Sequence, residues 1–219
     1  FMNTQSKQSN APLKRKVFVA LSGGVDSSVA AALLKERGFD VVGAHMKCWS
    51  GQPSPYGFGE ARGDCSSERD AEDARRVAEA LDIPFYVFDF EKEYRERVFN
   101  SMVREYEEGR TPNPDVLCNS EIKFGVFLEK ALALGADFIA TGHYVRKDGA
   151  RLYVASDTKK DQSYFLYRLA PAQVERAMFP LGELTKPEVR ELARKFRLPT
   201  AEKKDSQGLC FVGHLDFYD

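Results

Sequence analysis

The sequence predicts an α/β fold in which helices cover both faces of a doubly wound, mostly parallel sheet. Short apolar runs rich in Val, Phe and Ile alternate with segments that carry apolar residues at helical spacing. Strands separated by helices imply right-handed crossovers, which place ligands at the carboxyl ends of the strands. The expected strands cover residues 17–21, 41–47, 85–90 and 138–141.

The expected helices follow from the same periodicity. The first is rich in Ala and Leu and ends at Gly38, and the second starts at Ser67, which has capping-box spacing to Asp70. After Thr141 the pattern changes, and an Asp148-Gly149 turn indicates a hairpin over residues 144–154. The remaining expected helices cover residues 67–81, 94–106, 124–134 and 186–197.

Length and composition limit the class of protein. The chain has 219 residues, of which 43% are hydrophobic, enough for one core and part of a second. We expect a disordered tail over residues 1–14, a nucleotide-binding domain over 15–145, and over 146–219 a region that completes this domain and starts another. No apolar run approaches the roughly 20 residues of a membrane span, and four cysteines are too few for a disulfide scaffold. A soluble, cytoplasmic protein without a membrane partner is expected.

The charge is unevenly distributed along the chain. The net charge is only -1, but residues 143–204 hold 14 Lys and Arg against 8 Asp and Glu. Such an excess is compatible with a phosphate-backbone contact surface. A solvated basic surface explains the charge count equally simply.

The segment from Ser22 to Ser28, with the sequence SGGVDSS, lies between the first expected strand and the first expected helix. Unpaired backbone N–H groups and the helix dipole favour an anion at this position, and glycines let the backbone approach phosphate oxygens closely. The loop lacks the Gly-Lys-Ser/Thr ending of a P-loop and the spaced glycines of a dinucleotide fold. The alternative is an ordinary turn in which Ser27 or Ser28 caps the helix.

Two cysteines in polar loops are candidate nucleophiles. Cys118 follows a Pro-rich turn, and we expect Asn119 or Ser120 to cap the helix after it, so that the thiol lies just before a helix N-terminus. Asp115 lies within one turn and is a candidate acid or base. Cys210 lies 92 residues away. The alternative is two unrelated buried thiols.

The cysteines suggest two alternative metal sites, a zinc site and an iron-sulfur cluster. His45, Cys48 and Cys65 match zinc spacing poorly, and an iron-sulfur cluster would need Cys118, Cys210 and a third thiol. Neither candidate loop has a neighbouring cysteine, so no bound metal is predicted from the protein ligands.

Together, seven sequence blocks resemble the tRNA-specific 2-thiouridylase family (MnmA family) of the N-type ATP pyrophosphatases, or PP-loop superfamily. They stand in the family's order between about residues 16 and 213. The blocks are residues 22–28 (SGGVDSS), 46–47 (MK), 113–119 (NPDVLCN), 122–124 (IKF), 140–144 (ATGHY), 160–165 (KDQSYF) and 206–211 (SQGLCF).

The resemblance implies an adenine nucleotide alpha hydrolase-like fold and the use of ATP with Mg²⁺. In such enzymes ATP adenylates the C2 oxygen of the wobble uridine, uridine-34, of certain tRNAs and releases pyrophosphate. The positions that match ATP-binding residues are Ala20, Leu21, Ser22, Gly23, Gly24, Val25, Asp26, Ser27, Met46 and Gly142.

The resemblance also assigns the sulfur chemistry and the tRNA contacts. Cys210 would carry a persulfide received from a sulfur-relay protein, Cys118 would attack it, freeing sulfide or forming a Cys118–Cys210 disulfide, and Asp115 would act as acid or base. The positions that match tRNA-contacting residues are Asn113, Pro114, Asp115, Lys160, Asp161 and Gln162.

One departure from the family concerns length. Members continue into a β-rich C-terminal domain, whereas this chain stops at Asp219, so we expect a C-terminally truncated protein. The alternatives are a nucleotide-binding module that no longer turns over and an iron-sulfur-dependent PP-loop thiolase.

Overall fold

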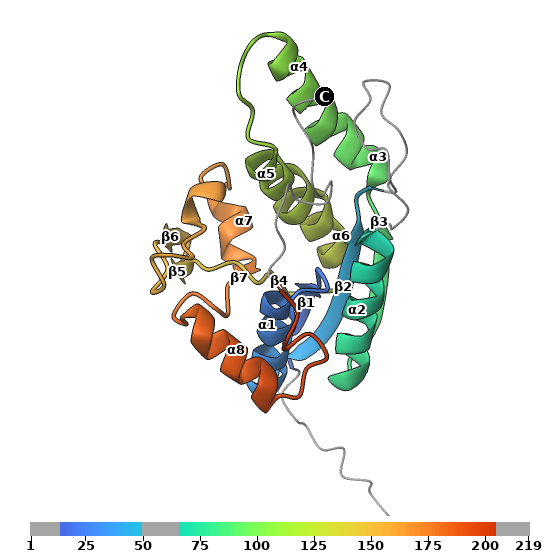
Figure 1. The fold of residues 1–219 in the computed structure, drawn as a ribbon, viewed down its shortest axis with the longest axis vertical. Coiled ribbons are helices and arrows are strands. Elements are labelled where there is room, and N and C mark those ends of the chain that lie inside the picture. Colours follow the sequence, from blue (N-terminus) through green and yellow to red (C-terminus); the bar gives the residue numbers. More distant parts are fainter. Residues whose placement is uncertain (1–13, 50–65, 205–219) are drawn as a thin grey trace, which may run out of the picture.

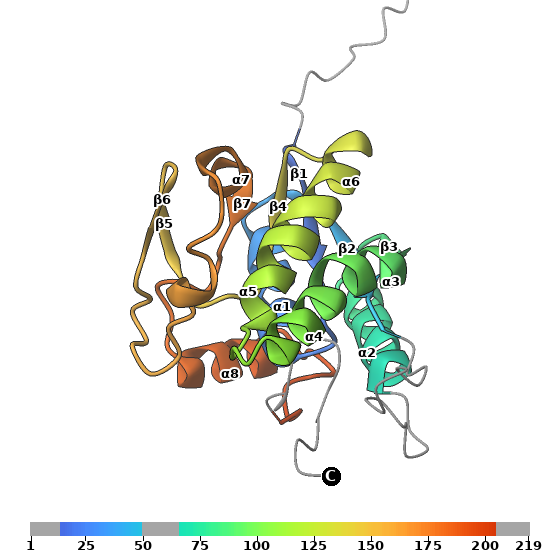
Figure 2. The ribbon, with the colours of Figure 1, turned by 90° about the horizontal axis from the view of Figure 1, so that it is seen from above.

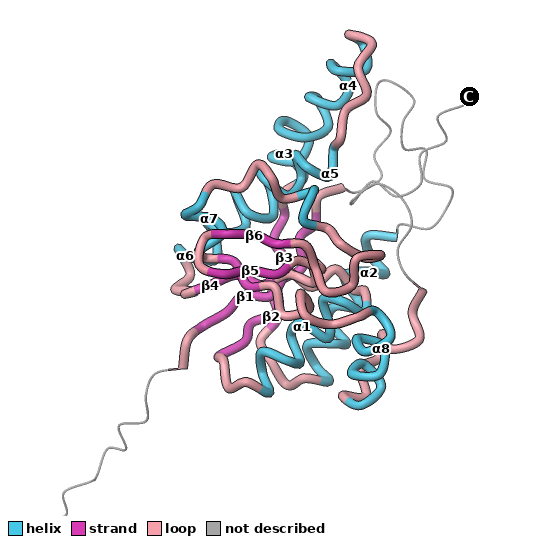
Figure 3. The backbone as a smooth tube through the Cα atoms, turned by 90° about the vertical axis from the view of Figure 1, so that its left-hand side faces the viewer, coloured by secondary structure: helices cyan, strands magenta, loops and turns pink. Residues whose placement is uncertain are grey.

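A five-stranded parallel sheet with the order β3-β2-β1-β4-β7 forms the centre of the computed structural model, which describes residues 14–49 and 66–204 (Figure 1). All four strand pairs are parallel, which confirms the expected α/β class. Figure 3 shows the strands at the centre with the helices around them. The strands are β1 (Lys16–Ala20), β2 (Asp40–Lys47), β3 (Phe85–Asp89), β4 (Phe138–Ala140) and β7 (Ala177–Met178).

Single helices and two composite helices surround the sheet (Figure 2). Each composite helix is continuous and contains a π-helical segment with wider turns. The single helices are α1 (Val25–Glu36), α2 (Ser66–Ala80), α7 (Pro171–Glu175) and α8 (Lys186–Lys195), with a short 3-10 turn η3 (Ser163–Phe165). The composite helices are α3 (Glu91–Tyr94), η1 (Arg95–Phe99) and α4 (Asn100–Glu107), and α5 (Pro114–Leu117), η2 (Cys118–Val126) and α6 (Phe127–Ala133).

Both faces of the sheet are buried, because β1 sends alternate side chains to two separate cores. Val17 and Val19 pack with α1 and α2, whereas Phe18 and Ala20 pack with the two composite helices. A strand buried on both faces has no polar alternation, which explains the uninterrupted apolar run that predicted it. The doubly wound arrangement with helices on both faces is thus confirmed.

The order in which strands are added to the sheet reverses beside β1. It winds outward through β2 and β3, then returns to place β4 on the other side of β1. In open α/β sheets the crevice at such a reversal, at the carboxyl ends of the strands, is where ligands bind. The segment after β1 therefore occupies the predicted ligand position.

Residues after β4 extend the same sheet. The predicted hairpin forms from β5 (Arg146–Asp148) and β6 (Arg151–Tyr153), with Gly149 at φ 54° in its turn. The chain then returns through α7 to β7, a strand that the sequence analysis missed. Lys147 donates from the hairpin to the carbonyls of Glu175 and Ala177, at 3.0 and 2.7 Å, and so joins hairpin and sheet.

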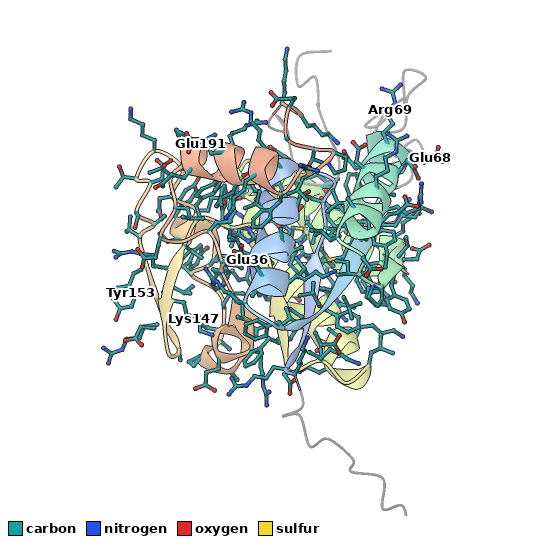
Figure 4. All side chains as sticks on the ribbon, turned by 90° about the horizontal axis from the view of Figure 1, so that it is seen from below. Glu36, Glu68, Arg69, Lys147, Tyr153 and Glu191 are labelled. Carbon is teal, nitrogen blue, oxygen red and sulfur yellow. The ribbon has the colours of Figure 1, made fainter. Side chains whose placement is uncertain are left out.

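Figure 4 shows Lys147 and Tyr153 of the hairpin far from Glu68 and Arg69 of α2. Burial lowers the pKa of Lys147, as expected for an ammonium group withdrawn from water to contact the carbonyls of Glu175 and Ala177.

The second helix begins at Ser66, one residue earlier than predicted. None of the helices within the described ranges is long and apolar enough to cross a membrane.

Several predictions fall outside the described residues. They are residues 1–13 of the expected tail over residues 1–14, the candidate metal ligand Cys65, the candidate nucleophile Cys210 and the matched block at residues 206–211. They stay predictions.

Gly182 tests the packing between the hairpin and the segment that leads into α8. A Cβ at this position would lie 2.2 Å from the carbonyl oxygen of Val145, so backbone would have to move. We expect Gly182→Ala to lower the free energy of unfolding by about 3 kcal/mol in urea titrations. Gly109→Ala is the control, because its φ of 73° is strained but its Cβ would meet no atom within 4 Å, and it should cost about 1 kcal/mol. An equal or smaller cost at Gly182 would contradict this packing.

Candidate nucleotide-binding site

The loop after β1 is held in shape by its own serines. Ser27 Oγ accepts a hydrogen bond from Ser22 N–H at 3.2 Å and donates to the carbonyl of Gly24 at 3.2 Å. The Ser22 hydroxyl lies 3.2 Å from the same Ser27 Oγ and 3.4 Å from Gly24 N. The side chain that sequence reasoning offered as a simple helix cap instead closes the loop upon itself. No side chain caps α1 at Gly24.

The N-terminus of α1 is therefore available to an anion. The first N–H groups of a helix have no partner within the helix, and its dipole adds partial positive charge. Gly23 has φ 75°, a conformation that favours glycine, and a Cβ there would lie 2.3 Å from the carbonyl oxygen of Asp70. The glycine thus allows α2 to pack directly against the loop.

Gly142 brings β4 to the same place. A Cβ on Gly142 would lie 2.7 Å from the Ser27 nitrogen and 2.9 Å from the Asp26 carbonyl carbon. The backbone after β4 therefore rests directly on the first turn of α1. Sequence reasoning placed Gly142 near the nucleotide, and the structure brings it to the loop.

Asp26, in the first turn of α1, has two partners from distant segments. The Tyr144 hydroxyl donates to Asp26 Oδ1 at 2.9 Å. Lys186 Nζ lies 2.7 Å from Oδ1 and 2.9 Å from Oδ2. The Lys186 side chain is 13% exposed and that of Asp26 33%. Sequence reasoning missed Lys186, whose only signal was its place at the start of a basic helix.

Ser28, also in the first turn of α1, binds the segment that leads towards the C-terminus. The Thr200 hydroxyl donates to Ser28 Oγ at 3.0 Å, and Ser28 Oγ donates to the Gly24 carbonyl at 2.7 Å. Lys203 binds Asp70 and Asp73 of α2 at 2.8 and 2.6 Å. Residues 200–203 are thereby fixed beside the loop, directly before the undescribed residues that contain Cys210.

The remaining predicted nucleotide residues lie around this loop. Ala20 and Leu21 are buried at the end of β1, and Leu21 pairs its N–H with the carbonyl of Ala44 in β2. Met46 is buried near the end of β2, beside Phe88 of β3. The predicted residues therefore come from the ends of three adjacent strands.

Cys118 lies inside a helix, not before one, which corrects the sequence prediction. Helix α5 begins at Pro114, and the Asn113 side chain caps it by accepting from Val116 N at 3.3 Å. The cap therefore stands six residues before the expected Asn119. Cys118 is fully buried, in the same apolar cluster as Met46.

The neighbouring candidates share this helix. Asp115 is half-buried in the first turn, three residues before Cys118, so the two side chains lie on the same face. Asn113 is exposed and Pro114 is buried. An aspartate and a cysteine one turn apart form a compact pair, although the thiol is closed to solvent.

The loop with Lys160, Asp161 and Gln162 is built around Tyr144. Gln162 accepts from Tyr144 N–H through Oε1 at 3.0 Å and donates its own N–H to the Tyr144 carbonyl at 3.0 Å. Asp161 accepts from Ala155 N–H at 2.9 Å, and Lys160 is exposed. Because Tyr144 also binds Asp26, this loop is joined to the nucleotide-loop candidate through one side chain.

The positive excess over residues 143–204 is partly structural. Lys147, Lys186 and Lys203 make the internal contacts described above, and Arg190 donates to the carbonyl of Ala201 at 2.9 Å. The exposed cations of this stretch include Arg151, Lys159, Lys160 and Arg168. A count of charges alone therefore overstates the surface available to a polyanion.

Of the three candidate zinc ligands, His45 and Cys48 lie within the described residues, and neither belongs to a cluster there that could bind a metal ion. His45 is buried, with Nδ1 2.9 Å from the Leu21 carbonyl oxygen, and Cys48 is buried in the apolar cluster. In the described ranges no group of three His, Cys, Asp or Glu could hold a metal ion. Cys65 and Cys210 lie outside these ranges.

His143 is structural in its surroundings. Its Nδ1 lies 2.8 Å from Thr141 Oγ1, and its ring packs against Phe124 and Phe179. Burial, with Lys123 nearby, holds the pKa of His143 well below its usual value.

Comparison with known proteins places this geometry in a family. The family described as tRNA methyl transferase HUP domain matches residues 15–214. A tRNA-specific 2-thiouridylase MnmA of Nitrosomonas europaea is 55% identical over 208 residues, covering 93% of this chain and 56% of that protein. The corresponding protein of Akkermansia muciniphila is 53% identical, covering 93% of this chain and 57% of its own length. The chain thus spans little more than half the length of these relatives.

Two solved structures share the fold at low sequence identity. The NMN synthetase of Francisella tularensis is 18% identical, with a TM-score of 0.55, and the match covers 90% of this chain and 70% of that one. A 4-thiouridine synthetase, solved as an RNA complex with bound ATP, is 16% identical, with a TM-score of 0.52 and coverage of 91% and 45%. By sequence and fold, the chain belongs to the tRNA methyl transferase HUP domain family, in which its curated relatives are tRNA-specific 2-thiouridylases.

Proposed function

We propose that the chain is the ATP-using part of a tRNA 2-thiouridylase, which replaces the C2 oxygen of uridine-34 by sulfur. The observation that carries the proposal is the serine-closed loop at the N-terminus of α1, which lies at the strand reversal of the sheet. Relatives named tRNA-specific 2-thiouridylase, more than 50% identical over most of this chain, support the substrate.

ATP would bind with its phosphates at residues 22–27. The helix N-terminus and the loop backbone offer donors to phosphate oxygens. Gly23 and Gly142 let α2 and the backbone after β4 pack closely against the loop and hold it in place. The base would lie towards Met46, at the end of the adjacent strand. Adenylation then requires positioning and charge stabilisation more than covalent help from the protein.

The family resemblance implies Mg²⁺ with ATP, and Asp26 is the residue that would hold it. Magnesium in such sites takes one or two carboxylates and completes its shell with phosphate oxygens and water, so one aspartate beside the phosphates suffices. When bound, the ion would neutralise charge on the leaving pyrophosphate. The carboxylate of Asp26 would hold it from the first turn of α1.

The adenylation step transfers the AMP group of ATP to the uridine oxygen. The C2 oxygen of the uridine attacks the α-phosphorus of ATP, the bond to the β-phosphate oxygen breaks, and pyrophosphate leaves. Asp115 would accept the proton from N3 of the base. It lies in the first turn of α5, next to the exposed Asn113, where we propose that the base binds. AMP, now bonded through the C2 oxygen, can then leave when sulfur attacks C2.

The sulfur step would use both cysteines. A persulfide on Cys210, loaded by a sulfur-relay protein, is attacked at the Cys210 sulfur by the Cys118 thiolate; the Cys118–Cys210 disulfide forms and hydrosulfide leaves. Hydrosulfide attacks C2 and displaces AMP. Because Cys118 is fully buried, this step requires the turn around α5 to open when tRNA binds.

The tRNA would contact the start of α5 and the loop at Lys160. Sequence-specific enzymes reach bases in single-stranded loops that can be splayed out. Lys160, Lys159 and Arg168 are exposed and would meet phosphates. Asp161 and Gln162 would act by holding the loop in place.

A thiolation assay tests the function. The chain is incubated with ATP, Mg²⁺, a persulfide donor and unmodified tRNA, and 2-thiouridine and AMP are quantified by mass spectrometry. Cys210→Ser should abolish 2-thiouridine while AMP formation persists, because only the sulfur carrier is lost. Cys48→Ser, at a buried cysteine outside the matched motifs, is the control and should retain both products. ATP binding without any 2-thiouridine in the parent chain would favour a nucleotide-binding module instead.

Gly142 tests the position of the phosphates. A methyl group at this residue would press on the Ser27 nitrogen, 2.7 Å away, and displace the first turn of α1. We expect Gly142→Ala to weaken ATP binding by at least tenfold in calorimetric titrations, equivalent to about 1.4 kcal/mol. An ATP affinity equal to that of the parent chain, in a folded variant, would place the phosphates elsewhere.

A further inference from the structure

Lys186 reaches the nucleotide loop from the far end of the sequence. It is the first residue of α8, which lies alongside α1 (Figure 1). Its Nζ lies within 2.9 Å of both carboxylate oxygens of Asp26, 160 residues away in the chain. An ammonium group therefore lies at the first turn of α1, beside Asp26.

The backbone at Lys186 is fixed by several bonds. Glu188 Oε2 accepts from both the N–H and the hydroxyl of Thr185, at 2.7 Å each, which forms a capping box. Asp157 Oδ2 accepts from Lys186 N–H at 2.9 Å. The Lys186 N–H contact lowers the pKa of Asp157, so the carboxylate stays charged and holds the helix start. The base of the side chain is thus rigidly placed.

The environment of the ammonium group is also specific. Lys186 Nζ lies 5.9 Å from the centre of the Tyr144 ring, and the Tyr144 hydroxyl donates to Asp26 Oδ1. The Lys186 side chain is only 13% exposed. A cation and a carboxylate largely removed from water gain little net stability from each other, because desolvation offsets their attraction. Stability alone therefore gives a weak reason for this pair.

Electrostatics at the loop gives a stronger reason. The negative charge of Asp26 alone would repel a triphosphate at the N-terminus of α1. Lys186 neutralises it while the site is empty. Bound ATP would offer a phosphate oxygen to the ammonium group and the accompanying Mg²⁺ would offer a cation to the carboxylate, so both side chains would exchange one charged partner for another. A lysine ammonium is a compact donor suited to phosphate.

We infer that Lys186 is a phosphate-binding residue for the β- and γ-phosphates of ATP and that Asp26 occupies its ammonium group in the empty chain. The inference rests on the proposed function. Lys186 would neutralise charge on the departing pyrophosphate during adenylation. The ligand it recognises is the polyphosphate of a nucleoside triphosphate, not the nucleoside.

The first test is a series of nucleotides. Binding of ATP, AMP and adenosine is measured by calorimetry for the 219-residue chain and for Lys186→Met. We expect the variant to bind ATP on the order of 30-fold more weakly, as for loss of one charge-assisted hydrogen bond, with adenosine affinity unchanged. Lys195→Met is the matched control, because Lys195 lies on the same helix with an exposed side chain 3.7 Å from Glu36, and it should change neither affinity.

The second test uses the sign of two effects without magnesium. In EDTA, Asp26→Asn should raise ATP affinity, because it removes a negative charge and releases Lys186, whereas Lys186→Met should lower it. Melting temperatures are recorded for every variant, and Lys186→Gln replaces Lys186→Met if that variant does not fold. Lys186→Arg should retain most of the ATP affinity.

The outcomes separate this inference from the proposed function. A parent chain that binds no ATP would overturn both. A parent chain that binds ATP, with Lys186→Met lowering ATP and adenosine affinity equally, would overturn only the role of Lys186. The same holds if Asp26→Asn and Lys186→Met change ATP affinity in the same direction without Mg²⁺, as a purely structural ion pair would.

Discussion

The first turn of α1 is the constraint on which the rest of the site depends. Of three consecutive residues there, two bind segments that are distant in the sequence, and the middle one closes the loop itself. Asp26 binds Tyr144 and Lys186, Ser27 closes the loop after β1, and Ser28 binds Thr200. Since the loop backbone is fixed by these bonds before any ligand arrives, its N–H donors need little reorganisation to meet phosphate.

Tyr144 connects this turn to the loop expected to contact tRNA. Its backbone is bonded on both sides by Gln162, and its hydroxyl reaches Asp26. A displacement of the Lys160–Gln162 loop would therefore shift the Asp26 carboxylate, which we propose as the Mg²⁺ ligand. Such a connection would let tRNA binding adjust the geometry of ATP activation without a separate regulatory domain.

Much of the fold could be predicted because its signals are local. The strand before Ser22 is buried on both faces, so its apolar run is continuous, and the Asp148-Gly149 turn directly specifies a hairpin. The two-residue strand β7 has no periodicity to detect, and its place beside β4 depends on long-range packing. The helix expected to begin at Asn119 or Ser120 begins instead at Pro114, because proline is favoured in the first turn of a helix and Asn113 provides the cap.

The site, like the fold, combines features that local sequence predicts with features that depend on long-range packing. The glycines and serines of the loop are adjacent in sequence, whereas the Asp26–Lys186 pair and the burial of Cys118 depend on tertiary packing that spacing does not encode. Amide NMR of the chain, titrated with ATP and separately with adenosine, tests directly whether phosphates bind at the first turn of α1. We expect ATP to shift the amides of residues 23–27 most strongly and adenosine to leave them nearly unchanged. Equal shifts with both ligands, or strongest ATP shifts outside this turn, would contradict it.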